Sequence, residues 1–253
     1  MAEQTGASAV AGSPTWWSRA ILIGAVVGAA LLPIGALGTR IGVWHFQIGL
    51  LMVAAGAALA AIGLVVGIAG IVAASRRRLA SDKPAVYLGT VISLLVLALM
   101  GTQFLAGLSV PPIHNISTDV VDPPAFDKIV TLRGDGTNPL EYDADTLAAV
   151  QREAYPGIKT RETSLAPAES LQRASAVLKD MGLEIVHVDE QAGIVEATAT
   201  TFWFGFKDDV VVRIRPAPSG AGSLVDLRSV SRVGVSDLGA NARRIGEFLE
   251  RFE

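Results

Sequence analysis

Three long apolar runs occupy the first part of the chain, at residues 20–38, 43–74 and 85–108. No Asp, Glu, Lys or Arg falls within them. A helix of about 20 apolar residues crosses the ~30 Å of hydrocarbon in a bilayer. The pattern therefore predicts three transmembrane helices after a cytoplasmic tail at residues 1–18. The first run exceeds the ~7 to 15 residues typical of a signal peptide's hydrophobic region, so we expect it to stay in the protein.

Basic residues between the runs indicate the orientation of these helices. Arg76, Arg77, Arg78 and Lys83 all lie between the second and third runs. Loops rich in Lys and Arg stay on the cytoplasmic side. With three crossings, the chain after Ser109 is then expected outside the cytoplasm.

Small residues recur along the second run. Gly49, Gly56, Gly63 and Gly70 follow one another at seven-residue intervals. Such a row lets two helices approach closely in lipid. It indicates either packing inside the three-helix bundle or a homo-oligomer formed through residues 43–74. The lack of charged residues within the runs argues against a transporter or pump.

After Ser109 the pattern is that of a soluble domain. Residues 109–127 contain paired prolines and predict an extended leader, which we expect to lie on the domain because Ile113, Ile116 and Phe126 would otherwise meet water. Helical spacing then predicts helices at residues 143–155, 167–181 and 237–252. Alternating apolar and polar positions predict strands at residues 183–189, 194–204, 209–216 and 223–233. Residues 128–253 should thus form an α+β domain, with a mostly antiparallel four-stranded sheet and helices on one face.

Charge is distributed unevenly between the two parts. The chain carries a net charge of −3, positive through residue 108 and negative beyond it. An acidic domain is a poor partner for nucleic acid, whose phosphates require Lys and Arg. There is no cysteine, which excludes disulfides and thiolate chemistry.

The alternation places several charged residues on the sheet face away from the helices. The candidate contact residues are Asp209, Arg213, Asp226, Arg228 and Arg232, with Glu196 beside them. Paired arginines flanked by carboxylates suit an anionic ligand or an acidic group of an envelope protein. The same pattern also fits a solvated sheet face with cross-strand ion pairs.

Aromatic residues are concentrated just before the third predicted strand. Phe202, Trp203, Phe204 and Phe206 lie within five positions, and successive strand side chains face opposite ways. They cannot all enter one core. Some are expected to be exposed, to line a groove or to meet the membrane interface.

Catalytic motifs are scarce, and neither a catalytic residue nor a cofactor is expected. The sequence has no phosphate-binding loop, zinc-protease motif or dinucleotide fingerprint. An envelope hydrolase could be built on Asp208, Asp209 and His114, and His114 with Asp119 and Asp122 could bind a metal ion. We expect no metal, because a lone histidine more often serves as a structural hydrogen-bonding group.

Several segments together resemble a known family. They are residues 112–119 (PIHNISTD), 196–201 (EATATT), 205–213 (GFKDDVVVR), 228–234 (RSVSRVG) and 237–245 (DLGANARRI). The chain resembles the bacterial family called domain of unknown function 1499 over nearly all of residues 110–252. Asn115 stands where that family often has Asp. The resemblance implies a bacterial protein with membrane helices ahead of the domain, and it implies no activity.

These patterns lead to one expectation and two alternatives. We expect a multi-pass protein of the bacterial inner membrane that presents a periplasmic or extracellular module for binding a ligand or a protein. The alternatives are an envelope enzyme, with or without a metal ion, and a structural subunit of a membrane complex.

Overall fold

The computed structural model describes residues 13–253 as two compact units. The first unit extends to Phe104, and the second runs from Leu105 to Glu253. Of the tail expected at residues 1–18, the first twelve residues lie outside the described part of the chain.

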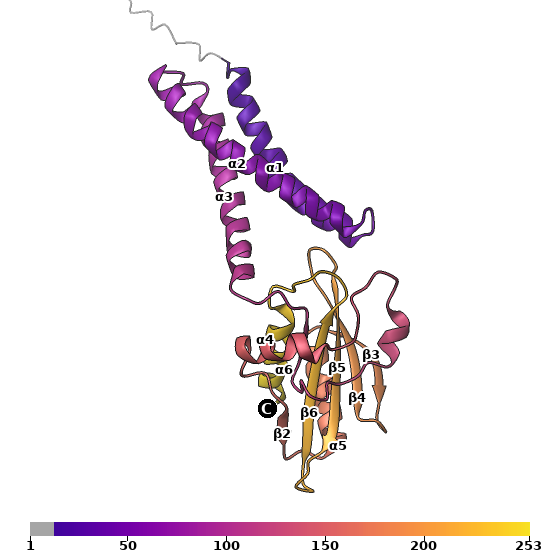
Figure 1. Cartoon of the computed structure of the whole chain (residues 1–253). Helices are drawn as coiled ribbons and strands as arrows, with labels where there is room; N and C mark the ends of the chain where they lie inside the picture. The colour runs from indigo at the N-terminus through magenta and orange to yellow at the C-terminus, as the bar shows by residue number, and fades with distance from the viewer. Residues whose placement is uncertain (1–12) are drawn as a thin grey trace, which may run out of the picture. The chain divides into compact units, whose positions relative to one another are not determined.

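Three long helices build the first unit (Figure 1). They are α1 (Trp16–Arg40), α2 (Phe46–Arg76) and α3 (Lys83–Leu108), whose last residues belong to the second unit. All three are long and apolar enough to cross a membrane, as the sequence predicted. The second helix begins three residues later than expected, because residues 41–45 turn the chain and Gly42 takes a left-handed φ of 76°.

The glycine row of α2 packs inside this bundle. A Cβ built on Gly56 would lie 2.6 Å from the carbonyl oxygen of Gly28 in α1, and one on Gly63 would lie 2.5 Å from the hydroxyl of Ser93 in α3. Close helix approach in lipid requires such bare backbone. Packing within one chain therefore accounts for the row, and association of chains through residues 43–74 stays a prediction.

The second unit contains the remaining elements. In chain order they are β1 (Asn115–Ser117), the 3-10 helix η1 (Lys128–Leu132), α4 (Ala144–Ala154), β2 (Arg161–Thr163), α5 (Pro167–Asp180), β3 (Glu184–Asp189), β4 (Ile194–Thr200), β5 (Lys207–Pro216), β6 (Ser223–Ser231) and α6 (Ala240–Phe252). This order confirms a helix and antiparallel sheet domain.

The sheet has six strands, so the prediction of four was incomplete. Its order is β1-β6-β5-β4-β3, and β2 also pairs with β6, antiparallel throughout. The added strands β1 and β2 have three residues each, too few for an alternating pattern to show.

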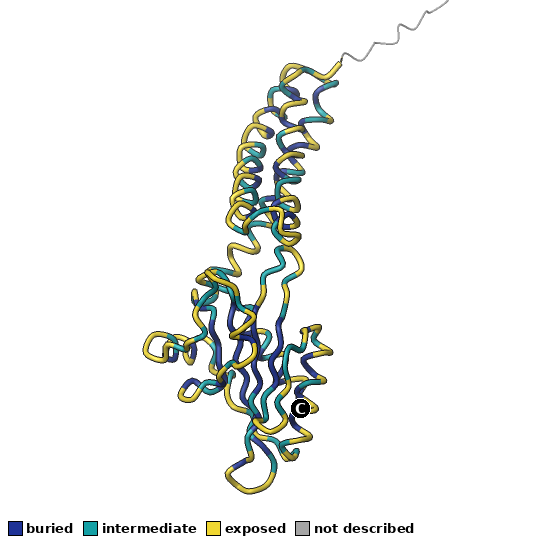
Figure 2. Tube along the Cα trace, turned by 90° about the vertical axis from the view of Figure 1, so that its right-hand side faces the viewer, coloured by how far each residue is buried: buried dark blue, intermediate teal, exposed yellow. Residues whose placement is uncertain are grey.

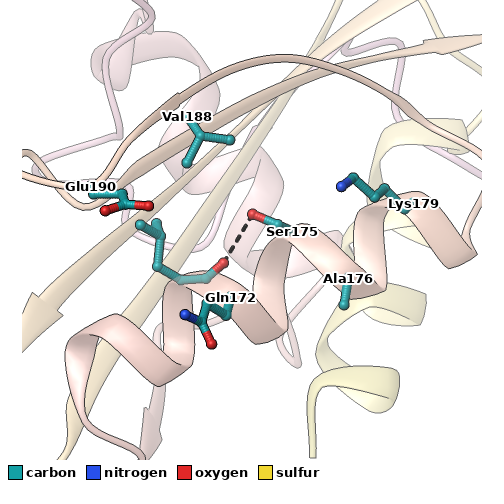
Figure 3. A pocket seen from close by; sticks show the side chains of 7 residues that line it. Gln172, Ser175, Ala176, Lys179, Val188 and Glu190 are labelled. Carbon is teal, nitrogen blue, oxygen red and sulfur yellow. Dashed lines mark hydrogen bonds between the residues drawn. The ribbon is translucent and has the colours of Figure 1, made fainter.

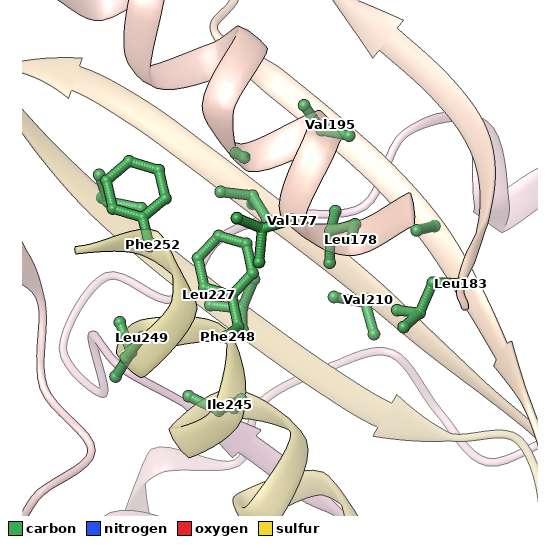
Figure 4. Packing of buried hydrophobic residues seen from close by; sticks show 14 of the residues in the cluster. Val177, Leu178, Leu183, Val195, Val210, Leu227, Ile245, Phe248, Leu249 and Phe252 are labelled. Carbon is green, nitrogen blue, oxygen red and sulfur yellow. The ribbon is translucent and has the colours of Figure 1, made fainter. Parts of the chain in front are cut away.

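Helices α5 and α6 cover one face of the sheet and bury the hydrophobic core (Figures 1 and 4). The helices contribute Leu171, Ala174 and Leu178 from α5, and Ile245, Phe248 and Phe252 from α6. The strands contribute Val195, Ala197, Val210, Val212, Val225 and Leu227. The leader also enters this core through Ile113 and Ile116, as predicted. Burying each large apolar side chain stabilises the fold by roughly 1.5 to 3 kcal/mol.

The last helix begins three residues later than predicted. Leu238 and Gly239 both take left-handed φ angles, of 53° and 74°, which interrupts the helix before Ala240. The carboxylate of Asp237 still accepts bonds from the backbone nitrogens of Gly239 and Asn241, at 2.8 Å each. It therefore satisfies amide groups of the first turn from outside the helix.

The opposite face of the sheet is covered as well, although the sequence suggested that it was half exposed. Residues 118–142, here called the covering segment, cross it and include η1. Figure 2 shows the strands beneath as buried along most of their length. Helix α4 closes the edge at β1, where the Gln151 side chain bonds both the backbone nitrogen and oxygen of Ser117. An edge strand is thereby paired by a side chain.

Candidate functional site

The strand register assembles the predicted charged face. Arg213 of β5 stands opposite Asp226 of β6, and Arg228 stands opposite Val211. Asp209 stands opposite Thr198 of β4. All three charged strands contribute to one face, so the alternation read from the sequence is correct.

Asp209 is the centre of the first ionic cluster. Its carboxylate is fully buried and receives bonds from Arg232 (2.8–3.1 Å) and from the hydroxyl of Thr198 (3.1 Å). A second guanidinium, that of Arg133 in the covering segment, donates to it at 2.5 Å. Burial lowers the pKa of Arg133, the charge of Asp209 offsets this, and the neighbouring Arg232 lowers it again. Asp209 thus holds two cations together.

Asp226 organises a second cluster toward the other end of the same strands. Its buried carboxylate accepts bonds from Arg213 (3.1 Å) and Arg215 (2.7 Å). The covering segment adds Asp119 and Asp122, which both form ion pairs with these two arginines. Two cations therefore share three carboxylates here.

Exposure divides the members of this second cluster. The side chain of Asp226 is inaccessible, whereas that of Arg213 is 15% exposed, that of Arg215 is 38% exposed and that of Asp122 is 69% exposed. Among residues 13–253, the Nε atoms of both arginines are buried without a hydrogen-bond partner. We call this cluster, with its solvent opening, the Arg213–Arg215 site.

The charges of the two arginines affect the pKa of Asp119. Burial raises it, but bonds from the backbone nitrogens of Asp122 and Val121 and the charges of Arg213 and Arg215 outweigh burial and leave it below its usual value of 3.8. The carboxylate is therefore ionised at neutral pH, as a partner of two cations must be.

Glu196 fastens η1 to the sheet. Its carboxylate is completely buried and accepts bonds from the backbone nitrogens of Asp127 (2.6 Å) and Ile129 (3.0 Å). A negative charge at the start of a helical turn satisfies amide groups that have no partner within the turn. Its function is structural.

Arg228 is buried without a carboxylate partner in the described part of the chain. Its guanidinium donates to the side-chain oxygen of Asn115 (3.0 Å) and to the carbonyl oxygens of Pro124 and Leu140. The rings of Phe126 and Tyr142 lie 5.5 and 5.7 Å from it. Burial lowers the pKa of Arg228 to about 10, so it remains a cation at neutral pH.

The five predicted contact residues thus differ in their access to solvent. Asp209, Asp226 and Arg228 are buried, and their bonds are to the chain itself. The side chain of Arg232, beside Asp209, is 15% exposed, as is that of Arg213. Arg213 differs in that its cluster includes the more exposed side chains of Arg215 and Asp122.

Arg133 was missed altogether. It lies in a segment without periodicity, between the leader and the first predicted helix of the domain, so no local pattern marks it.

The residues of the hydrolase alternative do not come together. Asp208 faces α6, where it pairs with Arg244 at 2.7 Å, while Asp209 lies on the opposite face under the covering segment. The Nδ1 of His114 lies 3.4 Å from the carbonyl oxygen of Val235. Within residues 13–253, no group of three or more metal-ligating side chains is placed to hold an ion.

A further polar cluster surrounds Asn241 of α6, which is fully buried. Its amide nitrogen donates to the backbone oxygen of His114 (3.0 Å) and to the hydroxyl of Ser231 (2.9 Å). Its amide oxygen accepts from Ser229 and Arg244. Asn241 therefore joins α6, β6 and the leader, which is a structural function.

Two shallow hollows lie elsewhere on this unit. One, of about 320 Å³, lies between α5 and β3, and Lys179 and Glu190 are among the residues that line it (Figure 3). The other, of about 440 Å³, is lined by Tyr155, Arg161 and Arg243 among others. Burial and the charge of Asp237 raise the pKa of Tyr155. Neither hollow includes any of the five predicted contact residues.

Comparison with known proteins adds a family and no activity. A search among curated proteins finds no match. The model of a family described as a protein of unknown function (DUF1499) matches residues 115–252, which takes in every strand and all of the elements that build the two ionic clusters. The match covers more than half of the chain and agrees with the resemblance seen in the sequence, so this protein belongs to the DUF1499 family.

Proposed function

We propose that this protein is a membrane-anchored module that binds an anionic ligand, or an acidic group of a partner protein, at the Arg213–Arg215 site. The observation that carries the proposal is the solvent opening of that site. Two adjacent guanidinium groups are held there by Asp122, a carboxylate whose side chain is 69% exposed. Elsewhere on the charged face the carboxylates of Asp209 and Glu196 are fully buried, and their contacts support the fold.

Asp122 is the group that a ligand would replace. Its carboxylate lies 2.9 Å from Nη1 of Arg213 and 3.5 Å from Nη1 of Arg215. A carboxylate or phosphate on a ligand can occupy the same position with the same charge, and arginine suits such planar, two-point recognition. The unused Nε donors of both arginines offer further bonds once the guanidinium groups turn.

The proposed location rests on the three apolar helices and the charges of the loop between the second and third. Three apolar helices with a basic loop after α2 support a bacterial inner-membrane protein whose C-terminal domain is periplasmic or extracellular. A reporter active only outside the cytoplasm should work when fused after Glu253 and fail when inserted between Arg78 and Lys83. The reverse result would place the domain in the cytoplasm.

Binding can be tested on the full-length protein in detergent micelles by calorimetry with inorganic phosphate and with a short acidic peptide. We expect Arg215→Gln to weaken binding by about 10-fold or more, since a hydrogen bond to a charged group contributes roughly 1.5 to 3 kcal/mol. Arg161→Gln is the matched control, because its side chain is also 38% exposed and pairs with a single carboxylate, that of Glu253.

The Asp122→Ala variant gives the sharper test. Removing the internal competitor should tighten anion binding, whereas a purely structural ion pair predicts no binding before or after the change. Absence of binding of both probes to the wild type and to Asp122→Ala would refute the proposal. Equal affinities of the wild type and Arg215→Gln would refute the assignment of the site.

A further inference from the structure

Exposed apolar side chains gather on two loops of the second unit. The turn between β4 and β5 presents Phe202 and Trp203, whose exposed fractions are 71% and 56%. The loop between β6 and α6 presents Val235 and Leu238, at 80% and 44%. Large apolar side chains concentrated in this way mark a surface that contacts another molecule or a membrane.

The β4–β5 turn holds its aromatic side chains in a defined arrangement. The backbone nitrogen of Thr201 donates to the carbonyl oxygen of Phe206 at 2.8 Å, and that of Phe206 donates to the hydroxyl of Thr201 at 2.9 Å. The rings of Phe204 and Phe206 stack at 5.0 Å, and those of Phe202 and Trp203 meet edge to face at 5.2 Å. The turn is therefore built to display two rings outward.

Both loops lie at the end of the sheet where the chain enters from α3 (Figure 1). Register puts Asn115, Val230, Asp209 and Thr198 in one row across four strands. On the side of residue 114, the β4–β5 turn and the β6–α6 loop lie beyond that row, together with the connection from α5 to β3 and Asn138 of the covering segment. The backbone nitrogen of Ser231 donates to the carbonyl oxygen of His114 at 3.0 Å, which fixes the leader beside these loops.

The tether between the last apolar helix and this end is short. Ile113 is already part of the hydrophobic core and is 6% exposed, so only residues 109–112 connect α3 to the folded domain. Four extended residues span at most about 14 Å. Trp203 stands five residues beyond Thr198, which is at most about 17 Å along the strand direction. Both lengths are upper limits of similar size, so the turn can extend in the same direction as the tether.

Leu238 lies beside the last residues of α3, which belong to the second unit. A Cβ built on Gly107, in the last turn of α3, would lie 3.0 Å from the Cδ2 atom of Leu238. The β6–α6 loop thus lies against the residues with which α3 ends.

We propose that these two loops form a second membrane contact, in which Phe202, Trp203, Val235 and Leu238 enter the interface of the leaflet at which α3 ends. Tryptophan and phenylalanine prefer this zone, where an apolar ring meets hydrated headgroups. Lys207, exposed directly after the turn, can extend its ammonium group to lipid phosphates. The contact holds the domain on the lipid surface and is independent of any ligand at the Arg213–Arg215 site.

The absence of cysteine permits a direct test with the full-length protein. Trp203→Cys, Val235→Cys and the control Ser219→Cys, in the exposed turn at the other end of the sheet, are each labelled with an environment-sensitive fluorophore. The labelled proteins are reconstituted in vesicles of phosphatidylcholine and phosphatidylglycerol, with or without lipids that carry a nitroxide near the top of the acyl chain. We expect a blue shift and strong quenching at positions 203 and 235, and neither at position 219.

Two outcomes would overturn the proposal. Quenching at positions 203 and 235 that does not exceed that at 219 would show that the loops stay in water. A blue shift without quenching by lipid would show that they contact protein instead.

A second measurement tests whether the turn creates the contact. In the Val235→Cys background, changing both Phe202 and Trp203 to Ser should lower the quenching at 235 at least twofold. Val121→Ser, a change of an even more exposed apolar side chain in the covering segment, should leave it unaltered. Because these side chains are exposed, the urea midpoint should not move, and unchanged quenching in the double variant would contradict the proposal.

Discussion

Removal of the Asp209 carboxylate should destabilise the domain far more than removal of an exposed carboxylate from the same face. In the Asp209→Ala variant, Arg133 and Arg232 remain side by side without the anion that holds them. Burial and the mutual repulsion of these cations, which already lower the pKa of Arg133, would then be unopposed. Breaking a buried ion pair in this way costs about 3 to 5 kcal/mol.

This loss can be measured on the full-length protein in detergent micelles, by pulse proteolysis of the second unit at increasing temperature. For a unit of this size, each kcal/mol corresponds to roughly 2 to 4 °C, so the thermal midpoint should fall by about 6 to 20 °C. Asp122→Ala is the control, because an exposed pair contributes only about 0 to 1 kcal/mol. Asp209→Asn keeps the shape and separates lost charge from lost packing.

Equal losses in Asp209→Ala and Asp122→Ala would refute the reasoning. That result would mean that water reaches the arginines and replaces the carboxylate. Faster hydrogen exchange in residues 133–138 of Asp209→Ala would identify the segment that is released.

Three further predictions concern other contacts. Glu196→Gln should cost about 1 to 3 kcal/mol, because one amide of η1 loses its acceptor, and hydrogen exchange should rise at residues 127–132 rather than throughout the unit. Asp119→Asn should flatten the acid side of the stability profile: the lowered pKa of Asp119 means that its ionised form stabilises the fold above its usual value of 3.8, and this is lost as pH falls through the folded-state pKa. Urea midpoints of the wild type and Asp119→Asn, measured at pH 5 and below, test this prediction. An equal dependence of the two midpoints on pH would contradict it. Gly56→Leu should separate α1 from α2 and expose the bundle to protease, whereas Gly24→Leu, with open space at its Cβ position, should not; equal behaviour of the two would exclude the glycine contact.

The strands and their two faces could be predicted because alternation is a local property of the chain. Val210 and Val212 face α5 and α6, while Asp209 and Arg213 face the other way, as a period of two requires. The same reasoning placed α5 within one residue, since Pro167 starts it and its apolar positions recur at helical spacing.

The cover on the charged face could not be predicted in the same way. Residues 118–142 have no period, and their placement depends on side chains that meet over long sequence distances, such as Arg133 with Asp209 and Asp127 with Glu196. From a single sequence, a sheet face with charged residues is expected to be exposed to solvent. The residues whose contacts permit its burial lie far away in the sequence and cannot be recognised as its partners. The sequence therefore predicted which residues lie on this face, but not that most of them are buried.

Contacts between the covering segment and charged side chains of the sheet explain why a face can be buried without being apolar. Successive positions of the segment engage different groups on the sheet: Thr118 engages Asp226, Ile129 engages Glu196 and Leu140 engages Arg228. An apolar segment could slide by a residue at little cost, whereas a slide here would leave several buried charges unpaired, at about 3 to 5 kcal/mol each. We infer that the charges fix the register of a segment that has no secondary structure of its own along most of its length. Because that segment begins five residues after the core residue Ile113, its register also fixes the position of Asp122 at the exposed end of the Arg213–Arg215 site.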